Sequence, residues 1–193
     1  GNFAVDTAGL LPPIPEIEPG LDASVTELPY LPAASAMAPK NAAGVTYPTV
    51  TDFNQRDTTH FDFTVDVSQG SLTDFSKWGG ALINFGDHSA NWFPLASEVV
   101  FKVLGNHDKL NVVFSSDVGL TAPTATVRLI RVSDSSQTYH IPKSLLRGSS
   151  GFNPNLIQSI SFIVSDQTLP DGVTTGNFAV DTAGLLPPIP EIE

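Results

Sequence analysis

Residues 60–68, HFDFTVDVS, are the stretch that decides the fold class. Apolar and polar side chains alternate along it, with Phe61, Phe63, Val65 and Val67 on one set of positions and Asp62, Thr64 and Asp66 on the other. A period of two places all the apolar side chains on one face of an extended chain, which is typical of a half-buried β-strand. The stretch therefore predicts a strand with one face in a core.

Further runs of the same kind follow along the chain. They are ALINF (81–85), SEVVFKVLG (97–105), LNVVFSS (110–116), ATVRLIRVS (125–133), QTYHIP (137–142), SISFIVS (159–165) and NFAVDTAGL (177–185). Turn-forming stretches such as GNHD and LPDG separate them, and only PKSLLRG (142–148) has the composition of a short helix. About eight strands at regular spacing predict an all-β protein, an antiparallel β-sandwich of the jelly-roll type.

Residues 11–50 differ in composition from the rest. Proline recurs in them at positions 12, 13, 15, 19, 29, 32, 39 and 48, which disfavours a helix and favours extended or polyproline conformation. We interpret this stretch as an extended, Pro/Ala-rich linker. Its apolar residues, Leu21, Leu28, Tyr30 and Leu31, suggest that it lies against a domain surface.

The first eighteen residues of the chain, GNFAVDTAGLLPPIPEIE, return unchanged as residues 176–193. An identity of this length does not arise by chance, so we interpret the chain as part of a tandem array with a period of 175 residues. The alternative is a cloning scar or a deliberate duplication of one strand. The expected organisation is a closing strand of the preceding repeat (1–10), the linker (11–50), the sandwich (51–187) and the start of the next linker (188–193).

The series from GGALINF through EVVFKVLGNHDKLNVVFSSDVG and YHIPKSLL to LIQSISFIVS and GNFAVDTAGL resembles the galactose-binding-like jelly roll. The pattern Ile-x-Ser-Ile-x-Phe, a turn, and Gly-x-Phe-x-Val-Asp is similar to the closing hairpin of those domains. The resemblance covers about residues 55–187. It implies a carbohydrate-binding-module-like domain of a bacterial extracellular tandem-repeat protein, located outside the cell or at its surface.

This resemblance makes residues 177–185 the last strand of the sandwich, and residues 2–10 a spare copy of it. A spare strand with apolar Phe3, Val5 and Leu10 would expose an edge and a hydrophobic face. It could be disordered, add to the sheet of a neighbouring copy, or have its own partner in a continuous polymer. We predict that Phe3, Val5 and Leu10 form a self-assembly strand whose partners are neighbouring copies of the chain.

Composition excludes several classes of function. The net charge of −11 argues against nucleic-acid binding, and no apolar run approaches the 18 residues of a membrane span. The chain has no cysteine, and its histidines at 60, 88, 107 and 140 lack metal-ligand spacing. Glu98 is the one glutamate of the globular part, so no pair of glutamates is present for glycoside hydrolysis. We predict that the protein is not an enzyme.

Sugar binding needs flat aromatic faces for pyranose rings and polar groups that orient the hydroxyls. The candidates are Trp78 in DFSKWGG, Trp92 in DHSANWFP, and Tyr139 on a later strand. The alternative is that these rings pack in the core or against a neighbouring unit.

A structural calcium ion is implied by the resemblance, since jelly-roll modules of this kind often hold one through an aspartate near the end of the last strand. That position corresponds to Asp181, repeated as Asp6, and Asp62 is a candidate second ligand. Calcium takes six to eight oxygen ligands. The alternative is a solvent-facing aspartate, and no other cofactor is expected.

The sequence as a whole predicts a repeat unit of an extracellular structural protein that builds a stalk or filament through strand and linker contacts between units. The alternative is a carbohydrate-binding module displayed in tandem for adhesion, with polysaccharide as its partner. Avidity from several copies would then replace tight binding by one.

Overall fold

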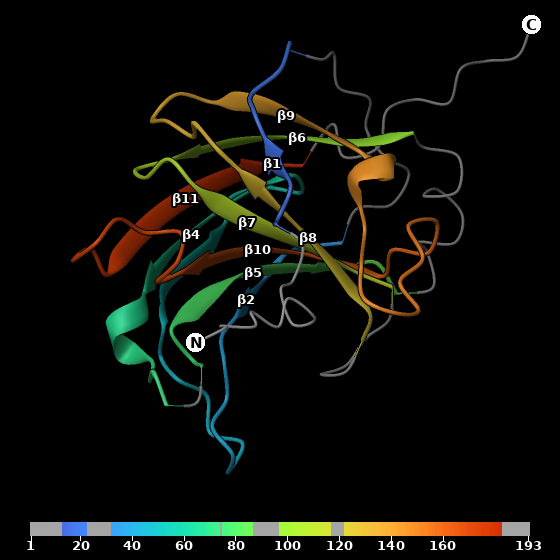
Figure 1. The fold of residues 1–193 in the computed structure, drawn as a ribbon. Helices are drawn as coiled ribbons and strands as arrows, with labels where there is room; N and C mark the ends of the chain where they lie inside the picture. The colour runs from blue at the N-terminus through green and yellow to red at the C-terminus, as the bar shows by residue number, and fades with distance from the viewer. Residues whose placement is uncertain (1–12, 23–31, 74, 87–96, 117–121, 183–193) are drawn as a thin grey trace, which may run out of the picture.

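The computed structural model describes residues 13–22, 32–73, 75–86, 97–116 and 122–182. Within these ranges the chain forms two β-sheets that stack face to face (Figure 1). Sheet A contains, in spatial order, β1 (Glu16–Ile17), β8 (Thr124–Leu129), β7 (Leu110–Ser115), β10 (Ser159–Ser165), β5 (Trp78–Asn84) and β2 (Ser35–Met37). Sheet B contains β3 (Val50–Gln55), β4 (His60–Asp66), β11 (Thr175–Asp181), β6 (Glu98–Gly105) and β9 (Gln137–Pro142). The antiparallel β-sandwich expected from the sequence is confirmed.

Alternation along each strand places the core between the sheets. The inward side chains of sheet B include Phe61, Phe63, Phe101 and Phe178, and those of sheet A include Phe114 and Phe162, all at most 2% exposed. The ring of Phe162 lies edge-on to Phe61 at 5.8 Å and to Phe101 at 5.1 Å between centroids. Such edge-to-face pairs are favourable beyond the area they bury, so Phe162 fastens one sheet to the other.

The expected strands and the observed ones agree closely, because the alternation that predicts them is the burial pattern itself. β9 and β10 have the expected bounds, and the others differ at their ends by a few residues. The PKSLLRG stretch forms a single 3₁₀ turn, η3 (Lys143–Leu145). A second turn, η1 (Val67–Gln69), ends β4, where the Asp66 carboxylate accepts a hydrogen bond of 3.0 Å from the Ser68 amide.

The described parts of residues 11–50 differ from the spacer expected from their proline content. β1 pairs in parallel with β8, and Ile17 is 5% exposed within the core. The Arg128 amide donates to the Pro15 carbonyl at 2.8 Å. β2 pairs with β5 at the other edge of sheet A. Extended proline-containing chain has nearly strand-like dihedral angles and is tolerated at sheet edges, so the same sequence serves as edge strands.

No helix among the described residues is long and apolar enough to span a membrane.

Candidate functional site

The outer face of sheet A carries a groove of about 560 Å³. It runs over the ends of β5, β10 and β7 and is bordered by the 71–77 loop and by Met37 of β2. On β5 the side chains of Ala81 and Ile83 lie in the core, so alternation turns Trp78 and Gly80 outward. The groove is therefore built on regular strands, which hold its floor in place.

Two aromatic rings line this groove. Trp78 is half-buried at the start of β5, and Phe75 in the preceding loop is 88% exposed. The other apolar lining residues are Met37, Leu72, Val113 and Ile163. Leu72 is also largely exposed, at 67%. Large apolar side chains gathered in an exposed groove are characteristic of a binding surface.

The loop that carries Phe75 is closed by the buried Ser76. The Ser71 amide donates to the Ser76 hydroxyl oxygen at 2.6 Å, and the Ser76 amide donates to the Ser71 carbonyl at 3.0 Å. Phe75 has a φ of +57°, in the left-handed region that non-glycine residues seldom adopt. The Trp78 amide donates to the Ser76 carbonyl at 2.9 Å, so the same serine positions both rings. The loop thus holds an apolar ring in solvent at some conformational cost.

Polar groups of several types line the groove between the rings and its far wall. They are Ser71, Lys77, Asn111, Ser161, Ser165, Asp166 and Gln167. Arg128 Nε donates to Asn111 Oδ1 at 2.9 Å. Because a guanidinium is only a donor, this contact fixes the Asn111 carbonyl toward Arg128 and leaves its amide nitrogen as a donor. The lining offers donors and acceptors beside flat apolar surface.

Gly80 keeps the floor beside Trp78 low. A Cβ at this position would lie 1.8 Å from the Phe162 carbonyl oxygen, so only glycine fits so close to the backbone of β10. Gly80 is also the next outward position after Trp78 on β5. Because Gly80 has no side chain, the outer face of β5 stays open directly after the Trp78 indole.

The structure places the three aromatic candidates differently. Trp78 lies in the groove, whereas Trp92 lies outside the described residues. Tyr139 is fully buried, its hydroxyl donates to the Ile130 carbonyl at 2.9 Å, and burial raises its pKa to about 12. A ring without exposed surface cannot stack on a sugar, so Tyr139 is removed from the candidate site. Phe3, Val5 and Leu10 of the predicted self-assembly strand also lie outside the described residues.

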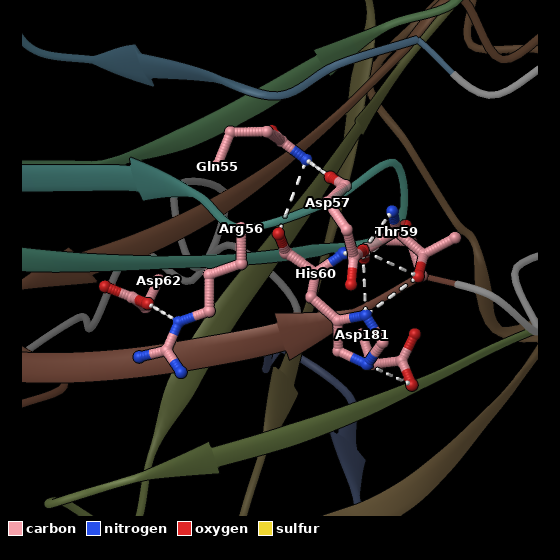
Figure 2. Close-up of polar contacts among 8 residues, drawn as sticks. Gln55, Arg56, Asp57, Thr59, His60, Asp62 and Asp181 are labelled. Carbon is pink, nitrogen blue, oxygen red and sulfur yellow. Dashed lines mark hydrogen bonds and ion pairs between the residues drawn. The ribbon is translucent and has the colours of Figure 1, made fainter.

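Asp62 and Asp181, the candidate calcium ligands, both lie on the outer face of sheet B (Figure 2). Asp62 forms an ion pair with Arg56, and Asp181 Oδ2 lies 3.1 Å from His60 Nε2. Across the described part of the chain, no three His, Cys, Asp or Glu side chains gather as a metal site would require. Each carboxylate faces a basic side chain instead of further oxygen ligands, so these residues do not fit calcium.

His60 is the centre of a polar cluster that the sequence analysis missed. Its Nδ1 lies 2.9 Å from Asp57 Oδ1, and its Nε2 lies 3.1 Å from Asp181 Oδ2 (Figure 2). His60 and Asp181 both line a small cavity of about 260 Å³. The Thr59 amide and His60 lower the pKa of Asp57 from its ordinary value. His60 Nδ1 also lies 2.9 Å from the Thr59 hydroxyl oxygen. The cluster joins the β3–β4 turn to the end of β11.

Comparison with protein-family models and with curated proteins finds no match. Among solved structures, the chain is similar to a family 11 carbohydrate-binding module from Clostridium thermocellum in complex with a β-1,3-1,4-mixed-linked tetrasaccharide. The two are 14% identical, the match covers 84% of this chain and 93% of the module, and the TM-score is 0.53. A family 30 module of a cellulosomal cellulase of the same organism gives 14% identity, coverage of 81% and 94%, and a TM-score of 0.44. The first match shows that the chain shares the β-sandwich fold of such a module.

Proposed function

We propose that this chain is a non-catalytic carbohydrate-binding module whose ligand lies in the groove on the outer face of sheet A. The observation that carries the proposal is the pairing of Trp78 and the exposed Phe75 with a row of polar side chains in one groove. The shared fold with a module described in complex with a tetrasaccharide supports it. We therefore prefer carbohydrate binding to the role of a structural stalk or filament.

The aromatic and polar groups of the groove match the two kinds of surface that a sugar presents. A pyranose ring has flat faces of C–H groups, which pack on indole and phenyl rings, and equatorial hydroxyls, which need donors and acceptors at the edges. A volume of about 560 Å³ lies within the range of small-ligand sites, on the order of 300–1,000 Å³. The net charge of −11 repels polyanions, so the ligand class is neutral polysaccharide rather than pectin or sulfated glycan.

The test is isothermal titration calorimetry together with native gel retardation in polysaccharides. The first probes are a mixed-linked β-1,3-1,4-glucan tetrasaccharide and cello-, xylo- and manno-oligosaccharides, with polygalacturonate as the charged comparison. We expect Trp78→Ala and Phe75→Ala each to weaken binding at least about tenfold, which corresponds to about 1.4 kcal/mol. Leu145→Ala, which removes a partly exposed apolar side chain away from the groove, is the matched control. Absence of wild-type binding to every neutral glycan would refute the proposal.

We also propose that the chain belongs to a tandem array whose modules act in series outside the cell. This proposal rests on the 18-residue identity between residues 1–18 and 176–193. In series, several weak sites on one polymer gain avidity without any new contact. The filament role of Phe3, Val5 and Leu10 stays a prediction. Light scattering of the chain with and without residues 1–18 tests it, because identical monomers would exclude self-assembly through that segment.

A further inference from the structure

β11 lies between β4 and β6 in sheet B, in a space that we call the slot. Several side chains of β11 make specific contacts there. Residues 176–182, GNFAVDT, occupy this slot as β11 without its first residue, Thr175, and with the residue after it. At its start, the Asn177 amide donates to Asn106 Oδ1 at 2.8 Å, and the Asn106 amide donates to the Asn177 carbonyl at 3.1 Å. The Asn177 side chain donates to Thr64 Oγ1 at 2.8 Å. This asparagine is therefore held by β4 on one side and by the residue after β6 on the other.

The middle of the slot is shaped for one aromatic ring. Phe178 is fully buried, and its ring lies 6.2 Å from that of Phe63. A Cβ at Gly105 of β6 would lie 2.3 Å from the Phe178 ring, so glycine there makes the space that the ring fills. Val180, 2% exposed, completes the inward face. The slot thus specifies phenylalanine and an aliphatic residue two positions later.

The far end of the slot is closed by the β3–β4 turn. Asp181 Oδ2 lies 3.1 Å from His60 Nε2. The Thr182 amide and hydroxyl donate to the Thr59 carbonyl at 2.9 and 3.0 Å. A strand that ends in Asp-Thr therefore gains contacts that another strand would lack.

The seven residues that make these contacts occur twice in the chain, as 176–182 and as 1–7. We propose that residues 1–7 are a second occupant of the slot in the same molecule, so that either copy of this strand closes the sandwich. The first copy can form the contacts that residues 176–182 make in the slot. Thr175, which pairs with Asp66, lies outside the repeated segment, so this pairing is not among the shared contacts.

The connection from the slot to β1 is long enough for this closure. Asp181 pairs with Lys102, Lys102 with Thr138, and Thr138 with Gly20. Three strand spacings are about 15 Å. Gly20 follows Glu16 by four residues, about 13 Å of extended chain. Residues 6 and 16 are ten positions apart and span up to about 33 Å, more than the sum of those two distances.

Closure within one molecule is also favoured by concentration. A short tether holds the first copy near the slot at an effective concentration of the order of millimolar. A strand from a second molecule competes only when the protein concentration is also of the order of millimolar. The proposal therefore predicts a monomer in dilute solution, whichever copy fills the slot.

The first test uses three variants of the full chain: Phe3→Asp, Phe178→Asp and the double variant. We expect each single variant to keep cooperative thermal unfolding and to remain a monomer by light scattering, because the intact copy closes the sheet. The double variant should lose cooperative unfolding. If Phe178→Asp unfolds like the double variant, the proposal is overturned. A folded dimer would also overturn it, in favour of exchange between chains.

The second test locates the strand directly. Ala179 faces Leu104 across β11 and β6, and the chain has no cysteine. Ala179→Cys with Leu104→Cys is the positive control for a disulfide at this register. In the Phe178→Asp background, Ala4→Cys with Leu104→Cys should form the same intramolecular disulfide on mild oxidation. If the control pair oxidises and the Ala4 pair does not, residues 1–7 do not enter the slot.

Discussion

Phe162 of sheet A packs against two aromatic rings of sheet B. Its ring is fully buried and meets the rings of Phe61 and Phe101 from the opposite sheet. We expect Phe162→Ala to lower the free energy of unfolding by about 3–5 kcal/mol, since it leaves a cavity among neighbours fixed by their strands. Urea unfolding followed by intrinsic fluorescence measures this.

The matched control for that prediction is Phe75→Ala. The same atoms are removed, but Phe75 is 88% exposed, so the free energy of unfolding should change by less than about 0.5 kcal/mol. A large loss at Phe75 would mean that its ring stabilises the fold, and its role in the groove would have to be reconsidered.

Of the two aromatic rings that line the groove, the sequence analysis named one. Trp78 was a candidate because a flat aromatic ring lies beside polar residues there. Tyr139 shares an alternation with Ile141, which places it on the inner face of β9, and that pattern was the better guide to its position. Phe75 was missed because an isolated ring in a loop has no periodicity to mark it.

At the element scale, substitutions in and after β1 test whether the proline-rich stretch belongs to the domain. Ile17 is 5% exposed, whereas Leu21 is 87% exposed only four residues later. We expect Ile17→Ala to lower the free energy of unfolding by about 2–4 kcal/mol and Leu21→Ala to leave it unchanged. Since Ile192 repeats Ile17, the double variant is measured alongside. Equal stability of all three variants and wild type would restore the interpretation of a spacer.

His140 fastens the segment after β1 to β9 in a pH-dependent manner. Its Nε2 lies 2.7 Å from the Leu21 carbonyl and its Nδ1 lies 3.2 Å from Glu98 Oε1. Both partners accept, so the charged ring can donate to both. The Leu21 carbonyl, and then Glu98, raise the pKa of His140 above its ordinary 6.5, although burial opposes them. This stabilisation is fully present below about pH 6.5 and is lost as pH rises through the folded-state value.

We therefore expect the thermal unfolding temperature of the wild type to fall between about pH 6 and pH 8 relative to that of His140→Gln, which cannot titrate. Proton NMR of the imidazole gives the folded-state pKa independently. A pKa at or below 6.5 would contradict the prediction, as would the same pH dependence in the variant.

The sequence predicted long strands better than short ones, for a physical reason. Strands such as β4, β9 and β10 bury one face, and burial imposes an alternation that can be read directly. β1 and β2 have two and three residues, too few to show an alternation, although Ile17 of β1 is buried. Edge strands of this kind become visible only when their partners are in place.

At the scale of the whole molecule, the two proposed sites lie on different sheets. The groove occupies the outer face of sheet A, and the exchangeable strand lies in sheet B. The core between them is packed with aromatic rings, and such cores transmit strain because they have few voids. An exchange between the two copies of the strand therefore leaves the groove unchanged under one condition. Both copies must fill the core in the same way.

This condition gives a final prediction. In Phe178→Asp, residues 1–7 are expected to supply Phe3 and Val5 in place of Phe178 and Val180, so the core and sheet A keep their positions. The affinity for the best oligosaccharide should then stay within about twofold of wild type, a difference of about 0.4 kcal/mol. Calorimetry on the folded variant measures this, with Trp78→Ala as the reference for lost binding. A folded Phe178→Asp variant with tenfold weaker binding would show that the first copy packs differently in the slot, because the two sheets meet through Phe162.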